Sequence, residues 1–392
     1  MMASGEAEAA VQGGRGRSAG LDLARALAIG MVFCSHVVTY GGGLPGVVMD
    51  GFSYLGHAGV ELFFSLSGFL IGGILIRMAR GGVGVRDVGR FWVRRWMRTL
   101  PLYWIVTFYL AYGTGVDMTH SYLLVQSFYP KEPRVLLVAW SLVMEEYFYL
   151  FFPLIMLGLG WVGLRGLRGV AFTAAGLIVT CIAVRYAVVL QWLDFPNAGL
   201  HDNPFLRLDC AAFGVLAACV AAGRGGAMRF VAAWRGVVAW GCFGVALVGW
   251  GGLFVWMLAV DGETLLRAGF ARWSPSYAVL QETVLDMLFA GGVLALAAVP
   301  LRWPGWAIWG VRQGSLLSYS VYLVHLTVLT TVEGFVPGGF SPVRIGVTTV
   351  VTLGVAAVTY HAIERPFLAV RDWLAPDGRR PGVWVAAGAA KP

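Results

Sequence analysis

The sequence carries very little charge for its length. Only 13% of its 392 residues are Asp, Glu, Lys or Arg, whereas a soluble domain carries about 25%. Hydrophobic residues make up 58%, so water would not solvate the chain as a globule. The shortage of charge therefore excludes a chain of ordinary soluble domains and implies contact with lipid.

Cysteine pairs and the short motifs of soluble enzymes are also missing. The five cysteines all fall inside apolar runs, so we expect neither a disulfide framework nor a cysteine metal site. The sequence contains no Walker loop, GxSxG elbow, HExxH pair or zinc-type spacing, and we expect no bound metal. The net charge of +8 indicates basic cytoplasmic loops rather than a nucleic-acid surface.

Long apolar runs fill most of the chain, and a helix needs roughly 20 such residues to cross a bilayer. The expected spans are residues 21–40, 55–76, 100–115, 140–160, 170–193, 205–222, 237–259, 277–300, 315–334 and 344–363. The expected fold class is thus all-α, a polytopic transmembrane helical bundle of about ten spans. Residues 1–20 are expected to form a disordered cytoplasmic tail, 21–368 the transmembrane domain and 369–392 a cytoplasmic C-terminal tail.

Basic residues are distributed unevenly among the segments between these spans. With the N-terminus inside, the cytoplasmic segments hold 21 Lys and Arg residues and the outer loops hold five. Cytoplasmic loops of membrane proteins are enriched in Lys and Arg, so this bias favours an even number of spans with both termini in the cytoplasm.

One set of charges lies near the inner face, where FWVRRWMRTLPLYW (91–104) leads into the third expected span. It places Arg94, Arg95 and Arg98 at neighbouring helical positions, with Arg25 at a similar depth in the first span. Guanidinium groups match phosphate geometry and stay charged when partly dehydrated, so this set is a candidate phosphate site. A positive-inside loop bound to anionic lipid heads is the alternative.

A second set of ionisable residues lies toward the outer face. Its members lie in the outer part of the first, second, fourth and sixth expected spans. They are His36, Glu61, Glu145, Glu146, Arg207 and Asp209. Ionisable groups in lipid are costly and usually functional, and a His beside a carboxylate is the usual general-base arrangement. We therefore expect Glu145 or Glu146 to orient His36. A hydrogen-bonded packing histidine is the alternative.

Two histidines have neighbours at helical spacing. Arg25 and His36 are eleven residues apart, so they share one face of the first helix, roughly 16 Å from each other. That spacing suits a substrate threaded along the helix, and equally a polar seam for packing. His325 lies mid-span, with Tyr322 one turn before it. This pair is either a pocket wall or a hydrogen-bonded core contact.

Five parts of the chain carry a recognisable pattern when taken in order. They are LDLARALAIGMVFCSH (21–36), GVELFFSLSGFLIGGIL (59–75), FWVRRWMRTLPLYW (91–104), WSLVMEEYFYLFFPL (140–154), and the closing pair SYSVYLVH (318–325) with IERPF (363–367). Together they resemble the acyltransferase 3 family of bacterial membrane O-acyltransferases, over about residues 21–368. The chain departs from the family pattern at Leu23 and Tyr147, which concerns the acceptor more than the reaction.

The resemblance implies transfer of an acyl group, usually acetyl, from acyl-coenzyme A to a hydroxyl of a sugar or glycan. It implies catalytic roles for His36, Arg25 and the acids Glu145 and Glu146, and donor binding by Arg94, Arg95 and Arg98. The candidate substrate-binding residues are Trp140, Ser141, Arg207, Asp209, Tyr322 and His325. The expected location is the inner (cytoplasmic) membrane of a bacterium, with lipid, donor and glycan as the partners and no nucleic acid.

Two other classes of function remain open. A transporter or flippase would use the same His, Glu and Arg residues as a proton relay or substrate path, although the sequence shows no inverted repeat. A polysaccharide-binding scaffold would leave the inner arginines without a role. Consumption of acyl-coenzyme A separates the enzyme from both.

Overall fold

The computed structural model describes residues 18–41, 44–129, 135–191, 200, 202–223, 226–252, 275–298, 303–336 and 341–376. All thirteen candidate site residues lie within these ranges. The expectations for the N-terminal tail up to residue 17, for the C-terminal tail from residue 377 and for the outer-loop residues Lys131, Arg134, Arg267 and Arg272 lie outside them.

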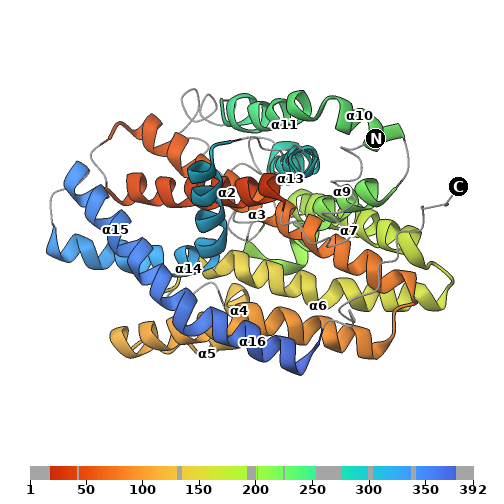
Figure 1. The fold of residues 1–392 in the computed structure, drawn as a ribbon, viewed down its shortest axis with the longest axis horizontal. Coiled ribbons are helices and arrows are strands. Elements are labelled where there is room, and N and C mark those ends of the chain that lie inside the picture. Colours follow the sequence, from red (N-terminus) through yellow and green to blue (C-terminus); the bar gives the residue numbers. More distant parts are fainter. Residues whose placement is uncertain are drawn as a thin grey trace, which may run out of the picture.

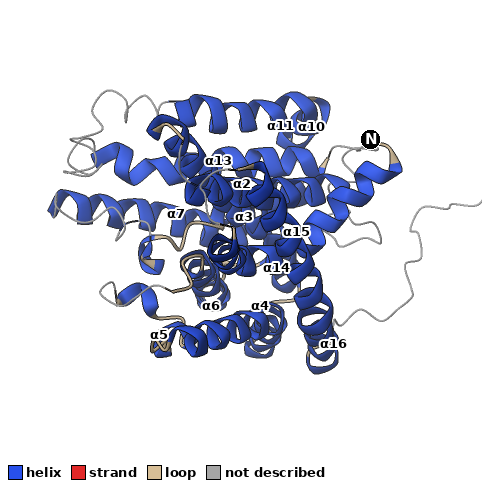
Figure 2. Ribbon diagram, turned by 90° about the vertical axis from the view of Figure 1, so that its left-hand side faces the viewer, coloured by secondary structure: helices blue, strands red, loops and turns tan. Residues whose placement is uncertain are grey.

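The regular elements of these ranges are helices, and no strand occurs among them (Figure 2). The long helices are α2 (Ala19–Gly41), α3 (Gly46–Arg80), α4 (Val85–Thr114), α6 (Ala139–Trp161), α7 (Gly166–Gln191), α13 (Pro275–Ala297), α14 (Gly305–Phe335) and α15 (Pro342–Thr359). The shorter ones are α5 (Thr119–Tyr122), α9 (Ala212–Ala222), α10 (Gly226–Ala233), α11 (Arg235–Gly244) and α16 (Arg365–Leu374). Single turns of 3-10 helix occupy Gln126–Phe128 (η1) and Pro204–Leu206 (η2), and π-helical turns occupy Val245–Trp250 (η3) and Tyr360–Glu364 (η4). The all-α fold class is confirmed.

Seven helical stretches of the described chain are long and apolar enough to cross a membrane. They are Ala19–Gly41, Val48–Arg80, Ala139–Trp161, Gly166–Gln191, Val279–Ala297, Gly305–Phe335 and Pro342–Leu374. Their length and composition identify a multi-pass membrane protein.

Three of the ten expected spans have a different form. Residues 100–115 fall almost entirely in α4, a continuous helix that begins at Val85 and is not among the helices apolar enough to count as a span. The expected span 205–222 contains the 11-residue α9, preceded by the turn η2. The expected span 237–259 begins with α11 and η3, and its residues from 253 onward lie outside the described part.

The helices are arranged around α2 and α3. Figures 1 and 2 show these two in the interior of the bundle, with α10 and α11 along one side and α4, α5 and α16 along the opposite side. Helix α3 packs against α2, α9 and α13, and α14 packs along α2. The face of α2 that carries Arg25 and His36 therefore has α14 as its neighbour.

Glycines allow α3 and α9 to approach closely. A methyl group at Gly68 would collide with the backbone carbonyl of Ala211, and one at Gly214 would collide with the carbonyl of Ser65. Small residues at such crossings are the usual means of packing helices in membranes, where lipid tails remove the hydrophobic driving force between helices. The crossing fixes the segment that precedes α9 against the middle of α3.

Candidate functional site

A cavity of about 510 Å³ lies in the described part of the chain. It lies where α2, α3, α4, α6, α14 and the C-terminal segment η4–α16 come together. One face of α3 lines it from Val60 to Arg77, which corresponds to about 25 Å of helix. Its volume is within the range of about 300–1,000 Å³ that is usual for small-molecule sites, and its length suits an extended ligand.

Arginines gather toward one end of this cavity. Those that line it are Arg25, Arg77, Arg95, Arg98 and Arg371, and the lining carboxylates are Glu145 and Glu364. Guanidinium groups bind phosphate with two parallel hydrogen bonds, and they outnumber the carboxylates here. This end is therefore suited to a ligand with several phosphate groups. The α3 wall between the two ends is apolar, with Leu66, Leu70, Ile71 and Ile74 among its residues.

Aromatic rings hold Arg95 against the cavity. Its guanidinium carbon lies 5.8 Å from the ring centroids of both Phe91 and Tyr149. The Nε atom of Arg95 is buried and has no hydrogen-bond partner among the described residues. Since buried donors are nearly always paired, an anionic ligand in the cavity would supply the acceptor that this group lacks.

Arg94, one residue earlier on α4, points to a different neighbour. Its Nη1 donates to the carbonyl oxygen of Ala375 at 2.5 Å, and its Nη2 lies 3.3 Å from the carboxylate of Asp372. Both partners lie at the end of α16, so Arg94 ties that helix to α4 and does not line the cavity. Arg94 and Arg95 are successive residues that point roughly 100° apart, so they contact different neighbours.

Glu145 and Glu146 lie with the arginines and not with His36. Glu145 lines the cavity and accepts hydrogen bonds from the hydroxyls of Ser67 and Tyr149. Glu146 is buried and accepts from Thr99 Oγ1 at 2.6 Å. The expectation that one of these acids orients His36 is wrong, because α14 rather than α6 faces His36.

The shared face of Arg25 and His36 is confirmed, and both contact α14. Arg25 Nη1 lies 3.4 Å from Ser315 Oγ, and that hydroxyl donates to Asp22 at 2.6 Å. Ten residues further along α14, His325 forms a hydrogen bond with His36. The α2–α14 pair thus connects the arginine end of the site to a pair of histidines.

Ser141 and Tyr322 line the end of the cavity nearest these histidines. Their hydroxyl oxygens are 2.5 Å apart. The ring of Tyr322 lies 6.1 Å from the ring of His325, so Tyr322 links the cavity wall to the histidine pair. Trp140, expected beside Ser141 as a substrate ligand, does not line the cavity and packs edge-on against Phe64.

The two histidines form a closely defined pair. His36 Nδ1 lies 2.8 Å from His325 Nε2, and the ring centroids are 5.0 Å apart. His325 is fully buried and His36 is half-buried. An imidazole with one accessible edge and a fixed partner on the other is suited to accept a proton from a bound hydroxyl.

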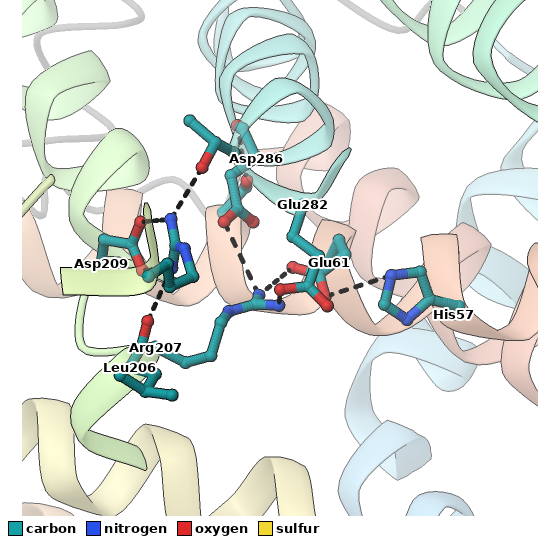
Figure 3. Close-up of polar contacts among 10 residues, drawn as sticks. His57, Glu61, Leu206, Arg207, Asp209, Glu282 and Asp286 are labelled. Atoms are coloured by element: carbon teal, nitrogen blue, oxygen red, sulfur yellow. Dashed lines mark hydrogen bonds and ion pairs between the residues drawn. The ribbon is translucent and has the colours of Figure 1, made fainter. Parts of the chain in front are cut away.

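Arg207 and Asp209 belong to a separate cluster of buried charges. Figure 3 shows the Arg207 guanidinium among the carboxylates of Glu61, Glu282 and Asp286, which come from α3 and α13. Arg207 is only 1% exposed and does not line the cavity. Arg207 thus lies in an ion-pair network of the described residues, and its expected role as a substrate ligand stays a prediction.

Asp209, in the turn before α9, is likewise an ion-pair partner, here of Arg185 on α7. It accepts two hydrogen bonds from Arg185, at 2.9 Å and 2.7 Å. Arg185 also donates to Thr283 Oγ1 of α13 and to the carbonyl oxygen of Leu206. These bonds tie the segment before α9 to α7 and α13. His57 extends the cluster toward the surface, 3.6 Å from Glu61.

The sequence did not reveal several residues that line the cavity. Arg371 comes from the C-terminal helix, and Ser67 and Tyr149 are ordinary-looking polar residues inside apolar runs. The signal for Ser67 and Tyr149 was their helical spacing. Ser67 lies about two and three turns from the ends of the lining face of α3, and Tyr149 lies one turn after Glu145.

Comparison with known proteins places the chain among acyltransferases. A family model described as an acyltransferase domain matches residues 18–361. The chain is 27% identical over 348 residues to a putative peptidoglycan O-acetyltransferase, YrhL, of Bacillus subtilis, which covers 79% of this chain and 50% of the relative. It is 24% identical over 335 residues to the O-acetyltransferase OatA of Staphylococcus aureus, with 79% and 52% covered. The chain spans about half the length of these curated relatives, and no solved structure matches it.

Proposed function

The chain belongs to the acyltransferase domain family, and from that premise we propose that it is a membrane O-acyltransferase. The reaction is transfer of an acyl group from acyl-coenzyme A to a hydroxyl of a sugar or glycan. Acetyl is the acyl group that we propose. The observation that carries this proposal is the cavity itself, with arginines at one end, an apolar wall, and a histidine pair just beyond the other end.

The donor lies along the cavity in this proposal. Its phosphates bind at the arginine end, where Arg95 and Arg98 line the wall together with Arg25, Arg77 and Arg371. Arg94 acts indirectly by holding α16, which carries Arg371. The thioester arm then follows the apolar face of α3 toward Tyr322.

His36 is the general base at the far end. It accepts the proton of the acceptor hydroxyl, and the hydroxyl oxygen forms a bond to the acyl carbon as the carbon–sulfur bond breaks. The imidazolium then returns its proton to the leaving thiolate, so the enzyme ends in its starting state. Without a base, a sugar hydroxyl is a poor nucleophile at neutral pH. Ser141 and Tyr322 are placed to position the reacting groups, and Glu145 to position the donor arm through Ser67 and Tyr149.

The acceptor class follows from the relatives. One is named as a peptidoglycan O-acetyltransferase, and a glycan of the cell envelope is the matching acceptor for this chain. In the proposed arrangement the transmembrane domain covers residues 21–368 with ten spans in the inner membrane. The tails 1–20 and 369–392 are both cytoplasmic. The donor then enters from inside and the acceptor meets His36 toward the outer face.

The test is release of free thiol from acetyl-coenzyme A by the purified protein in lipid nanodiscs, with envelope glycans as acceptors. We expect thiol release and acetylated glycan with the wild type. His36→Ala should lower the rate at least a hundredfold while the yield of folded protein stays the same. The same loss is not expected for His361→Ala, since His361 is exposed on η4 and lies outside the cavity and the histidine pair.

The transporter alternative predicts a different result. A folded protein that moves glycan or acyl donor across vesicles but releases no thiol from several acyl donors would replace the enzyme with a transporter. Thiol release that is unaffected by His36→Ala would keep the reaction and remove His36 as its base.

A further inference from the structure

The partners of His325 determine where that ring carries its hydrogen. Its Nδ1 lies 2.8 Å from the carbonyl oxygen of Tyr322 and 3.0 Å from that of Val321. Carbonyl oxygens only accept hydrogen bonds, so Nδ1 must be protonated and act as the donor. The backbone of α14 therefore fixes the tautomer of His325.

The second nitrogen of His325 is a bare acceptor. The side chain is 0% exposed, and its ring contacts are Phe33, Tyr322 and His36. No carboxylate of the described chain hydrogen-bonds to either histidine. A buried imidazolium without a counter-charge is costly, so His325 stays neutral with a lone pair on Nε2.

This acceptor in turn fixes His36. His36 Nδ1 lies 2.8 Å from His325 Nε2, and one of the two nitrogens must donate. Since His325 Nε2 carries no hydrogen, His36 Nδ1 carries it, and the lone pair of His36 lies on Nε2. The ring planes are 28° apart and Tyr40 packs edge-on at 6.0 Å, which keeps the His36 ring in this orientation.

We propose that His325 is a positioning residue that holds His36 in the one tautomer able to act as a base through Nε2. The inference rests on the proposed role of His36. As the acceptor hydroxyl gives its proton to His36 Nε2, the Nδ1–H bond to His325 becomes charge-assisted and strengthens. A neutral imidazole thus takes the orienting place that a carboxylate holds in His–acid pairs, and it does so without burying a negative charge in the membrane.

Two substitutions of His325 separate positioning from packing. His325→Gln keeps an acceptor oxygen at about the place of Nε2, whereas His325→Leu fills the space without an acceptor. We expect His325→Leu to lower kcat roughly a hundredfold and His325→Gln less than tenfold. The KM for acetyl-coenzyme A should change less than twofold in both, since His325 does not line the donor cavity. Equal loss in both variants, or a rise in the donor KM that matches the fall in kcat, would contradict positioning and indicate a packing role.

The tautomer itself can be measured without the reaction. The protein is labelled with ¹⁵N-histidine, placed in lipid nanodiscs at pH 7.5, and the His36 signals are identified by their loss in His36→Gln. We expect a protonated Nδ1 and an unprotonated Nε2 for His36 in the wild type and in His325→Gln. In His325→Leu the two tautomers should mix. A wild-type His36 with unprotonated Nδ1 would overturn the inference even if the enzyme is active. Conversely, the expected spectrum from a protein without acyl-transfer activity would remove the proposed function and leave the pairing intact.

Discussion

At the scale of single residues, two neighbouring arginines of α4 make different contacts: one lines the cavity and the other binds a neighbouring helix. Arg95 faces the cavity with a buried Nε that has no hydrogen-bond partner in the described part of the chain, while Arg94 binds the end of α16. Both carry one positive charge and both lie in the same helix. Their difference is direction alone, which makes them a matched pair for testing where the donor phosphates bind.

Arg95→Gln should raise the KM for acetyl-coenzyme A about tenfold or more and change kcat by no more than a few-fold. A hydrogen bond to a charged group contributes about 1.5–3 kcal/mol, and each 1.4 kcal/mol is a factor of ten. Arg94→Gln removes the same charge from the same helix and should raise the KM less than threefold. Steady-state kinetics of thiol release give both constants. Equal effects of the two substitutions would mean that the donor senses the net charge of α4 and not a contact with Arg95.

The residue scale is also where sequence reasoning was both most and least successful. The eleven-residue spacing of Arg25 and His36 fixed their common face, because helical geometry is local. The partner of His36 is distant in the sequence. The expected depth in the membrane was the same for Glu145, Glu146 and Arg207, so it could not identify the residue that contacts His36. Only the packing of α14 against α2 shows that the partner is His325. Buried acids in a membrane protein have several ways to be satisfied, and hydroxyl donors such as Thr99 leave no charge pattern in a sequence.

At the scale of elements, the cluster around Arg207 holds the turn before α9 against α3 and α13. Its guanidinium lies 2.8 Å from Glu61 and 3.8 Å from Asp286, with Glu282 also in contact. Such a buried network adds little by its presence, because desolvation offsets the attraction between the charges. Removing one member destabilises the protein strongly, because the remaining charges stay buried without a partner of opposite charge.

Arg207→Gln should lower the free energy of unfolding by about 3–5 kcal/mol, because the carboxylates around it lose their counter-charge. Thermal unfolding in detergent micelles measures the change. Arg229→Gln, on the exposed part of α10, makes the same substitution where little is expected. Adding Glu61→Gln to Arg207→Gln should recover part of the loss. A stable Arg207→Gln protein with a raised KM for the glycan would return Arg207 to the role of substrate ligand.

At the scale of the whole molecule, the open question is whether α4 crosses the membrane. The sequence identified the most apolar helices directly, and the helical stretches that cross by composition match seven of the expected spans within a few residues at most ends. Helix α4 is not among these stretches, and its first half carries the cavity arginines Arg95 and Arg98. Its second half exposes large apolar side chains that suit lipid: Trp104, Ile105, Phe108, Tyr109 and Tyr112.

Labelling of single cysteines decides the path of α4. The helix has 30 residues, or about 45 Å, which is enough to extend from the inner surface through a hydrocarbon core of about 30 Å. Arg86 near its start and Leu123 just beyond its end are both exposed. In a chain whose native cysteines are replaced, we expect a membrane-impermeant maleimide to label Arg86→Cys only in inside-out vesicles and Leu123→Cys only in right-side-out vesicles. Labelling of both from the inner side would place α4 along the membrane surface. The helices after it would then cross in the opposite direction, and the excess of basic residues on the cytoplasmic side would no longer hold for that part of the chain.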